Sequence, residues 1–188
     1  MQATKLKEVL EDEHLAVRRH KAGDAELLYE AVMDSFDELS RWMPWCSESY
    51  TLDSSKEWIN LEQKLWNAGN EYAFAIFEKG KNKLIGGCGL NRLDHLNRTG
   101  NLGYWIRSGY TKKGYASKAA MLAVKFGLID LGLNRIEIIC AAENKASSKV
   151  ANKLGAKKEA SLRSRLIINE KVHDAYLYSI ISSDFIER

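Results

Sequence analysis

Residues 101–116, NLGYWIRSGYTKKGYA, join an apolar strand to a helix through a turn rich in glycine and lysine. The first N–H groups of a helix have no intrahelical partners, and the helix dipole adds positive charge there. Gly114 has no Cβ to hold an anion away from the backbone, and Lys112 and Lys113 add charge beside it. The sequence therefore predicts a phosphate-binding site where this turn enters the helix.

A nucleotide-hydrolysing P-loop does not fit the same turn. Gly109 and Gly114 have the P-loop spacing, but Tyr115 and Ala116 stand where that loop needs Lys and Ser or Thr. The side chains that would bind the terminal phosphates and Mg²⁺ are therefore missing.

A dinucleotide-binding fingerprint fails as well. Gly86, Gly87 and Gly89 lie in LIGGCGLNR, but Arg92 stands where the third glycine should be. These glycines are more typical of a close backbone approach or a bulge within a strand.

Length and composition indicate one ordered domain that spans residues 1–188. Hydrophobic residues make up 45% of the chain and charged residues 28%, with a single proline. No apolar run is long enough to cross a bilayer and the N-terminal segment has no signal-peptide core, so we expect a cytoplasmic protein without a membrane partner. The net charge of +3 arises from mixed signs, so no direct nucleic-acid partner is expected.

The cysteines and histidines do not indicate a metalloenzyme. Cys46, Cys88 and Cys140 are widely separated in apolar settings, which suits buried or partly buried free thiols better than a disulfide framework or a zinc site. The four histidines form no H-E-x-x-H pair, and no serine lies in a G-x-S-x-G elbow. No metal is expected.

Hydrophobic periodicity predicts a mixed α/β fold with a central sheet of six or seven strands and helices on both faces. A strand over 14–20 is followed by a helix capped by Asp24, a helix over 54–67 and three antiparallel strands. A helix over 115–130 then connects to further strands, and this β-α-β crossover places parallel strands side by side where their ends can splay. The expected later elements are a strand over 135–141, a helix over 146–154 and strands near 157–168 and 172–182.

The chain resembles the GCN5-related N-acetyltransferases over nearly its whole length. The resemblance rests on the order of the strand LGYWI, the turn KKGYA, the segment CAAENKASSKVANKLGA and the late strand HDAYLYSII. It is closest to the branch that acetylates the N-termini of ribosomal proteins, because Arg41-Trp42-Met43-Pro44-Trp45 and Asn144-x-x-Ser147 are similar to segments of that branch.

This resemblance implies an acetyl-CoA-dependent N-acetyltransferase that binds its co-substrate between splayed parallel strands. It also implies a homodimer. The residues expected to bind the cofactor are Trp105, Ile106, Arg107, Lys112, Lys113, Gly114, Tyr115, Ala116, Ser117 and Asn144. Backbone groups of the 105–107 segment would pair with the pantetheine amides and supply an N–H to the thioester oxygen.

Ser147 is the candidate for protonating the CoA thiolate as it leaves. By resemblance its hydroxyl lies close to the CoA sulfur, near the start of a helix. A purely structural alternative stays open, in which Asn144 and Ser147 cap that helix. The two roles are compatible for Asn144.

The general base is harder to assign from the sequence. Family members often carry acids where this chain has Asn101 and Leu166. Asp174, which shares a strand face with Tyr176 and Tyr178, is the candidate that binds or deprotonates the amine, although a structural aspartate fits it equally well. Asp94 and Glu143 are further candidates.

Trp42 and Trp45 flank a proline in a predicted loop and are expected to contact the acceptor, whereas helical spacing favours a core position for Trp58. The leading acceptor is a protein N-terminal amine. A small amine such as a polyamine, aminoglycoside or amino acid is the alternative. A non-catalytic acyl-CoA-binding module is a third hypothesis, suggested by the missing acids.

Overall fold

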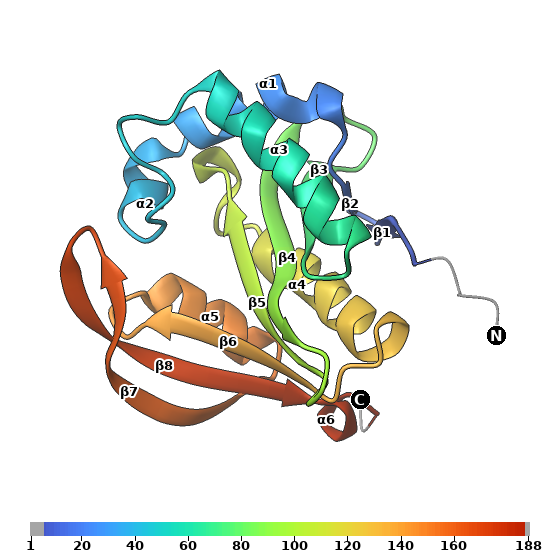
Figure 1. The fold of residues 1–188 in the computed structure, drawn as a ribbon, viewed down its shortest axis with the longest axis vertical. Coiled ribbons are helices and arrows are strands. Elements are labelled where there is room, and N and C mark those ends of the chain that lie inside the picture. The colour runs from blue at the N-terminus through green and yellow to red at the C-terminus, as the bar shows by residue number, and fades with distance from the viewer. Residues whose placement is uncertain (1–5, 187–188) are drawn as a thin grey trace.

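The computed structural model describes residues 6–186, with side chains described as far as Asp184, and confirms the mixed α/β architecture (Figure 1). One sheet carries eight strands in the order β1-β2-β3-β4-β5-β6-β8-β7. The strands are β1 (Val9–Glu11), β2 (Leu15–Arg19), β3 (Tyr72–Glu78), β4 (Leu84–Asp94), β5 (Thr99–Ile106), β6 (Arg135–Ala141), β7 (Lys157–Ile168) and β8 (Lys171–Ile181).

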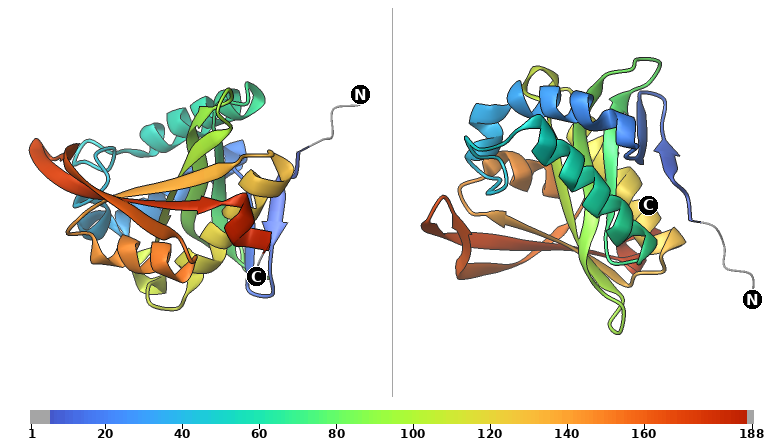
Figure 2. Two further views of the ribbon diagram at one scale, coloured as in Figure 1. Left: turned by 90° about the horizontal axis from the view of Figure 1, so that it is seen from below. Right: turned by 45° about the horizontal axis from the view of Figure 1, so that its top comes forward.

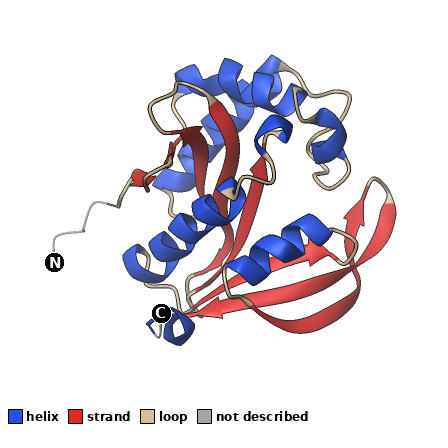
Figure 3. Ribbon diagram, turned by 180° about the vertical axis from the view of Figure 1, so that it is seen from behind, coloured by secondary structure: helices blue, strands red, loops and turns tan. Residues whose placement is uncertain are grey.

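Helices cover both faces of this sheet, as predicted. The helices are α1 (Ala25–Met33), α2 (Phe36–Ser40), α3 (Leu52–Asn67), α4 (Tyr115–Lys125), α5 (Lys145–Lys153) and α6 (Ser182–Ile186), with short turns η1 (Ala22–Asp24), η2 (Ser108–Tyr110) and η3 (Phe126–Asp130). Helices α1 and α3 lie on one face, and α4 and α5 lie on the other, which faces the viewer in Figure 3.

The only parallel pairing in the sheet of described residues joins β5 to β6, and it is short. Thr99, Gly100 and Asn101 pair with residues 135–137, and the two strands then part. All other neighbouring strands are antiparallel. The long β7–β8 hairpin continues away from the N-terminal strands (Figure 2). The splay between parallel strands is therefore confirmed.

Besides the short turns, three elements were not predicted from the sequence, namely β1, α2 and α6, and one helix was predicted too long. β1 brings the number of strands to eight, above the predicted six or seven. It has three residues in an acidic segment, with one buried residue between two exposed ones, which is too short for an alternating pattern to be detected. Helix α2 adds a single turn after α1. The expected helix over 115–130 changes at Phe126 into a π-helical turn.

Aromatic rings fill the core between the sheet and the end of α4. Phe126 is fully buried and its ring lies 5.3 Å from that of Phe74 and 5.4 Å from that of Tyr72. Trp66 from α3 packs on the same cluster, with its ring 4.9 Å from Phe74. The π-helical turn thus brings a large apolar side chain against β3, on the face of the sheet that α4 covers.

The three cysteines are buried free thiols, in agreement with the sequence. The close backbone approach predicted at the β4 glycines is also present. A Cβ on Gly89 would lie 2.5 Å from the carbonyl oxygen of Tyr72, and a Cβ on Gly87 would lie 2.7 Å from Nε1 of Trp105. A side chain at either position would displace a neighbouring strand or the Trp105 ring.

Glu62 is a buried carboxyl group on the sheet-facing stripe of α3. Its side chain has 3% of its surface exposed, and neither oxygen has a hydrogen-bond partner among the described residues. Burial raises the pKa of Glu62 to about 7, against the opposing effect of Arg19.

Replacing this residue by its neutral isostere tests that assignment. Because the folded-state pKa is raised, wild-type Glu62 destabilises the fold increasingly from about pH 4.5 up to about pH 7, where the unfolded chain alone is ionised. We expect Glu62→Gln to raise the thermal midpoint by a few degrees at pH 8 and by much less at pH 5. Thermal unfolding across this pH range measures it, and a midpoint difference independent of pH would contradict it.

Candidate active site

The free edge of β5 faces the gap left by β6. In an antiparallel pair, alternate residues direct their N–H and C=O groups to the same neighbour. Arg107 N–H donates to the Ile85 carbonyl at 2.8 Å, and the Arg98 carbonyl accepts from Asn134 N–H at 2.8 Å on the other side. This alternation directs the backbone groups of Tyr104 and Ile106 into the gap and those of Trp105 and Arg107 toward β4.

At the predicted phosphate turn the backbone is left-handed at two positions just before a helix begins. Lys112 and Gly114 both have positive φ, 61° and 82°, and α4 begins directly after them. The first helical bond runs from Lys118 N–H to the Gly114 carbonyl at 3.1 Å, so the N–H groups of residues 115–117 have no intrahelical acceptor. A Cβ on Gly114 would meet nothing within 4 Å, which leaves open space beside these donors.

Ser147 lies across the gap from β5, in contact with a tyrosine that the sequence analysis missed. The Tyr104 hydroxyl lies 3.0 Å from both Oγ and the carbonyl oxygen of Ser147. Burial raises the pKa of Tyr104, so this hydroxyl stays protonated. Oδ1 of Asn144 accepts from Ser147 N–H at 3.0 Å, so the helix cap left open by the sequence is present. The backbone groups of successive β5 residues point alternately to the two sides of the strand. Counting this alternation along the sequence would have placed the backbone of Tyr104 toward the gap.

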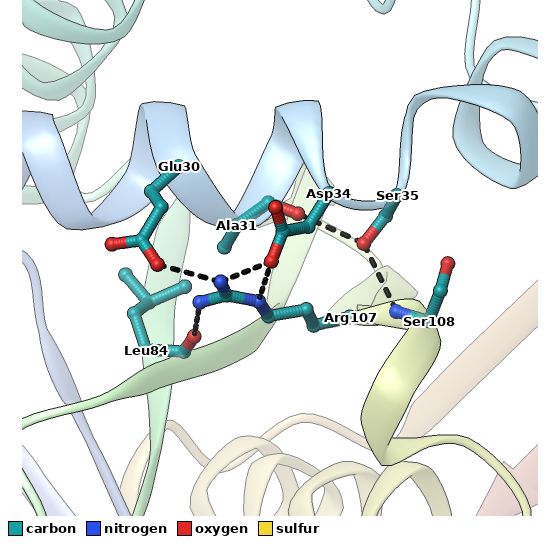
Figure 4. Close-up of polar contacts among 7 residues, drawn as sticks. All are labelled: Glu30, Ala31, Asp34, Ser35, Leu84, Arg107 and Ser108. Atoms are coloured by element: carbon teal, nitrogen blue, oxygen red, sulfur yellow. Dashed lines mark hydrogen bonds and ion pairs between the residues drawn. The ribbon is translucent and has the colours of Figure 1, made fainter.

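Arg107 departs from its expected place. Its N–H and carbonyl are both bonded, the latter to Tyr110 N–H at 2.8 Å, so its backbone is not free for pantetheine. Its side chain turns toward α1 and meets Glu30 and Asp34 (Figure 4). The expectation of a free backbone at Arg107 is therefore corrected. The same correction applies to Trp105, because the alternation along β5 directs its backbone groups to β4 and not to the gap. Ile106 retains the predicted geometry.

A cavity of about 600 Å³ lies between α3 and the sheet, on the face opposite α4. Small residues form its floor, because Ala73, Gly89 and Gly103 are direct neighbours across β3, β4 and β5. His20 follows the last β2 residue and lines the cavity beyond Ala73. The cavity therefore extends across the sheet from the β5 edge.

Aromatic side chains surround this floor. Trp45, from the loop after α2, has 45% of its surface exposed and its ring lies 6.3 Å from that of Trp105. Both line the cavity, whereas Trp42 does not. Trp58 also lines it with 40% of its surface exposed, so the expectation of a core position was wrong. Helical spacing correctly places Trp58 on the face of α3 that is directed to the sheet. It does not reveal that this part of the face borders the cavity.

The charged groups that line the cavity are all acidic. They are Glu57 from α3 and Glu71 before β3, with no lysine or arginine among the described lining residues. Burial raises the pKa of Glu71. His20 is uncharged at neutral pH, because burial lowers its pKa to about 4. The charge that the lining side chains themselves contribute is therefore negative, with Arg92 close enough to Glu71 to act on its pKa.

The acidic candidates from the sequence lie elsewhere. Oδ1 of Asp174 accepts from Ser164 N–H at 2.8 Å across the β7 bulge, and Asp94 holds a turn through Asn97 at 2.9 and 2.7 Å. Neither lines the cavity. Asn101, one of the two positions where the family resemblance led us to expect an acid, donates to Asn91 Oδ1 at 2.9 Å. A catalytic role for Asp174 stays a prediction.

Comparison with known proteins decides the family. Residues 14–157 match the model of the acetyltransferase (GNAT) domain. The chain belongs to the GNAT acetyltransferase family. It is 29% identical over 178 residues to the uncharacterized N-acetyltransferase p20 of Bacillus licheniformis, covering 95% of this chain and 98% of the relative. It is 27% identical over 175 residues to the putative ribosomal N-acetyltransferase YdaF of Bacillus subtilis, covering 93% and 94%.

A solved structure supports the same placement. The ribosomal-protein-S5-alanine acetyltransferase from Vibrio fischeri superposes with a TM-score of 0.86 at 27% identity, covering 94% of this chain and 97% of that one. The GNAT protein described here is thus an acetyl-CoA-dependent N-acetyltransferase, and acetyl-CoA is its co-substrate.

The residues present fit this co-substrate. The backbone groups of Tyr104 and Ile106 face the gap, and the open side of Gly114 adjoins the unpaired N–H groups of α4. Among residues 6–186, no group of three potential ligands is placed to hold a metal ion, and no helix is long and apolar enough to span a membrane.

Gly114 provides a test of the phosphate turn. We expect Gly114→Ala to weaken acetyl-CoA binding about tenfold, since an L-residue at φ 82° costs about 1–2 kcal/mol and the turn relaxes away from the geometry that aims its N–H groups. Calorimetry measures the dissociation constant. Gly109→Ala is the matched control, because Gly109 lies in the same turn without a positive φ and a Cβ there meets nothing within 4 Å. Equal affinities for the two variants would place the phosphates elsewhere.

Proposed function

We propose that this GNAT enzyme acetylates the α-amine of a protein N-terminus, with a ribosomal protein as the substrate. The observation that carries the proposal is that the cavity reaches β5 at the residues that border the gap. Gly103, Tyr104 and Trp105 line the cavity, while the backbone of Tyr104 faces the opening toward β6. An amine held in the cavity and a thioester held in the gap therefore meet at β5.

In this proposal the acetyl-CoA pantetheine lies in the gap and pairs with the backbone of Tyr104 and Ile106. Attack of the amine places negative charge on the thioester oxygen, and an N–H directed into the gap stabilises that charge. One such donor contributes about 2.7–4 kcal/mol to the transition state. The phosphates of the co-substrate lie at Gly114 and residues 115–117, with Lys112 and Lys113 beside them.

Ser147 is proposed to protonate the departing thiolate. Its hydroxyl lies at the first turn of α5 and contacts the Tyr104 hydroxyl at 3.0 Å. Because Tyr104 remains protonated, its hydroxyl donates to the Ser147 carbonyl oxygen at 3.0 Å, and its lone pairs can accept from Ser147 Oγ until the serine proton moves to the sulfur. Asn144 fixes the backbone of Ser147 through the cap at 3.0 Å.

A protein terminus is supported by the relatives named for ribosomal-protein acetylation in Bacillus subtilis and Vibrio fischeri. The shape of the cavity adds to this, because a floor of small residues lets an extended main chain lie close to the sheet. Trp45 and Trp105 offer apolar contact to the first side chain of such a terminus.

A cationic small amine is the second candidate. Glu57 and Glu71 are the charged groups that line the cavity, and a second positive group on the acceptor would pair with them. A polyamine carries such a group, and so does a peptide with an early basic residue. The charge of the cavity favours both over an uncharged or acidic acceptor.

The deciding experiment measures thiol release from acetyl-CoA with purified protein. The acceptors are N-terminal peptides with neutral or basic second residues, polyamines, and peptides blocked at the α-amine. Transfer to free but not blocked peptides supports the proposal. Preferential transfer to polyamines replaces it with the second candidate. Acetyl-CoA binding without transfer to any amine would identify a non-catalytic binding module.

Ser147→Ala tests the proton donor. We expect kcat to fall on the order of 10²-fold while the acetyl-CoA dissociation constant changes little. Ser148→Ala is the matched control, since Ser148 is the next residue and its Oγ contacts Cys140 Sγ at 3.7 Å rather than Tyr104. Full kcat in Ser147→Ala, with chemistry shown to be rate-limiting, would assign Ser147 to the helix start alone.

Gly103→Val tests the cavity as the acceptor site. A Cβ at Gly103 would meet only Asn91 Nδ2, at 3.8 Å, so valine fits the strand and fills the cavity. Overpacking by about 1–3 kcal/mol predicts an acceptor KM about ten- to a hundredfold higher. Steady-state kinetics measure this, and calorimetry should give an unchanged acetyl-CoA dissociation constant. An unchanged acceptor KM would move the acceptor site away from α3.

A further inference from the structure

We propose that Arg107 is a positioning residue that fixes the free end of β5 to α1, and so holds Ile106 and the phosphate turn in the geometry that acetyl transfer requires. The proposal rests on acetyl transfer at the gap between β5 and β6, whichever amine is the acceptor. Nothing in the cofactor motif assigns this role to Arg107, whose side chain points toward α1 (Figure 4).

The guanidinium group of Arg107 binds two carboxylates from one helix. Nε donates to Asp34 Oδ2 at 2.9 Å and Nη2 donates to Glu30 Oε1 at 2.7 Å. Nη2 also contacts Asp34, and Nη1 lies 3.4 Å from the Leu84 carbonyl oxygen. Glu30 and Asp34 are four residues apart, so both project from the same face of α1. The arrangement uses the planar fork of arginine, which a lysine cannot reproduce.

Because its guanidinium group is buried, Arg107 depends on these two carboxylates. Arg107 has 5% of its surface exposed, and a buried cation without partners is strongly unfavourable. Glu30 and Asp34 are more than half exposed, so a shift of Arg107 away from them would leave only the guanidinium buried and without its compensating charge. The position of the Arg107 backbone is therefore tied to the position of α1.

The next residue repeats the attachment. Ser108 N–H donates to Ser35 Oγ at 3.0 Å, and Ser108 Oγ donates to Glu38 at 2.7 Å. Ser35 Oγ in turn donates to the Ala31 carbonyl at 2.8 Å. Two consecutive residues after β5 are thus bound to the segment that joins α1 and α2 (Figure 4).

The location of these contacts explains why they matter. After Asn101, β5 has β4 on one side and no strand on the other. A strand with one neighbour is held by half the usual backbone bonds, yet this part of β5 carries Ile106, whose N–H faces the gap. Arg107 comes directly after Ile106, and the phosphate turn begins directly after η2. The arginine supplies the fixed point that β6 would provide in a continuous sheet.

The contacts of Arg107 and Ser108 with the α1–α2 segment also position one wall of the cavity proposed to bind the acceptor. The α1–α2 segment leads into the loop of Trp45, whose ring lies 6.3 Å from that of Trp105 on β5. Fixing α1 to the end of β5 therefore fixes the cavity wall relative to the gap. Misplacement of reacting groups by about 1 Å can cost on the order of 10²-fold in rate.

The chain offers a matched control. Arg18 on β2 binds Asp24 through both Nη atoms at 2.7 and 2.8 Å, near the opposite end of α1. It is a partly buried arginine–carboxylate pair that joins a strand to the start of the same helix, and it does not line the cavity. Arg18→Gln removes a comparable pair from the same helix without touching the end of β5.

The experiment compares Arg107→Gln, Arg107→Lys and Arg18→Gln at a temperature where thermal unfolding shows each to be folded. We expect Arg107→Gln to lower kcat about 10- to 100-fold and to weaken acetyl-CoA binding up to tenfold. Arg107→Lys should recover part of kcat, because it restores the charge but not the two-sided contact. Arg18→Gln should lower the thermal midpoint and leave kcat and the acetyl-CoA dissociation constant within about twofold of wild type.

Two outcomes overturn the proposal. One is an Arg107→Gln protein that is folded and keeps wild-type kcat and acetyl-CoA affinity. The other is an Arg18→Gln protein that loses as much kcat, which would make the effect a general loss of stability. If wild type transfers acetyl to no amine, calorimetry still decides, because weaker acetyl-CoA binding in Arg107→Gln but not in Arg18→Gln supports the positioning role independently of the proposed acceptor.

Discussion

β5 loses its neighbour on one side after Asn101, and most of the functional geometry follows from that loss. Backbone N–H and C=O groups inside a protein need partners, so a strand whose edge is released in the interior is ready to bind a ligand with amide groups of its own. The antiparallel β4 keeps the other edge paired and the strand extended. β6 stays extended where it leaves β5, because β8 pairs with its other edge along its whole length. The opening therefore lies between two strands that are each held on their far side.

Features that depend on a few consecutive residues were predictable from the sequence. The turn from Lys112 to Gly114, the helix after it and the Asn144 cap each depend on a few consecutive residues with strong local preferences. The mixed sheet with a splayed parallel pair followed from the order of strands and helices. β1 was not predictable, because a three-residue edge strand has no period to detect and owes its conformation to β2.

Features that depend on contacts between distant segments were not predictable. Arg107 was expected to serve the cofactor through its backbone, but two carboxylates some seventy residues earlier determine where its side chain goes. Tyr104 and Ser147 meet only because β5 and α5 border the same gap. Trp58 was placed in the core because periodicity reports which face of α3 meets the sheet. It cannot report that Gly89 and Gly103 leave a hollow beneath that face.

The glycine floor of the cavity has a consequence for how such an enzyme changes during evolution. Gly87, Gly89 and Gly103 contribute no side chain, so discrimination between acceptors is left to α3, to the loop that carries Trp45, and to lining side chains such as Trp105 and Glu71. The edge of β5 that borders the gap, the turn at Gly114 and the start of α5 belong to other segments of the chain. Substitutions in α3 or in the Trp45 loop can therefore change which amine is accepted without altering the segments that bind acetyl-CoA. One scaffold can in this way give rise to paralogues with different substrates.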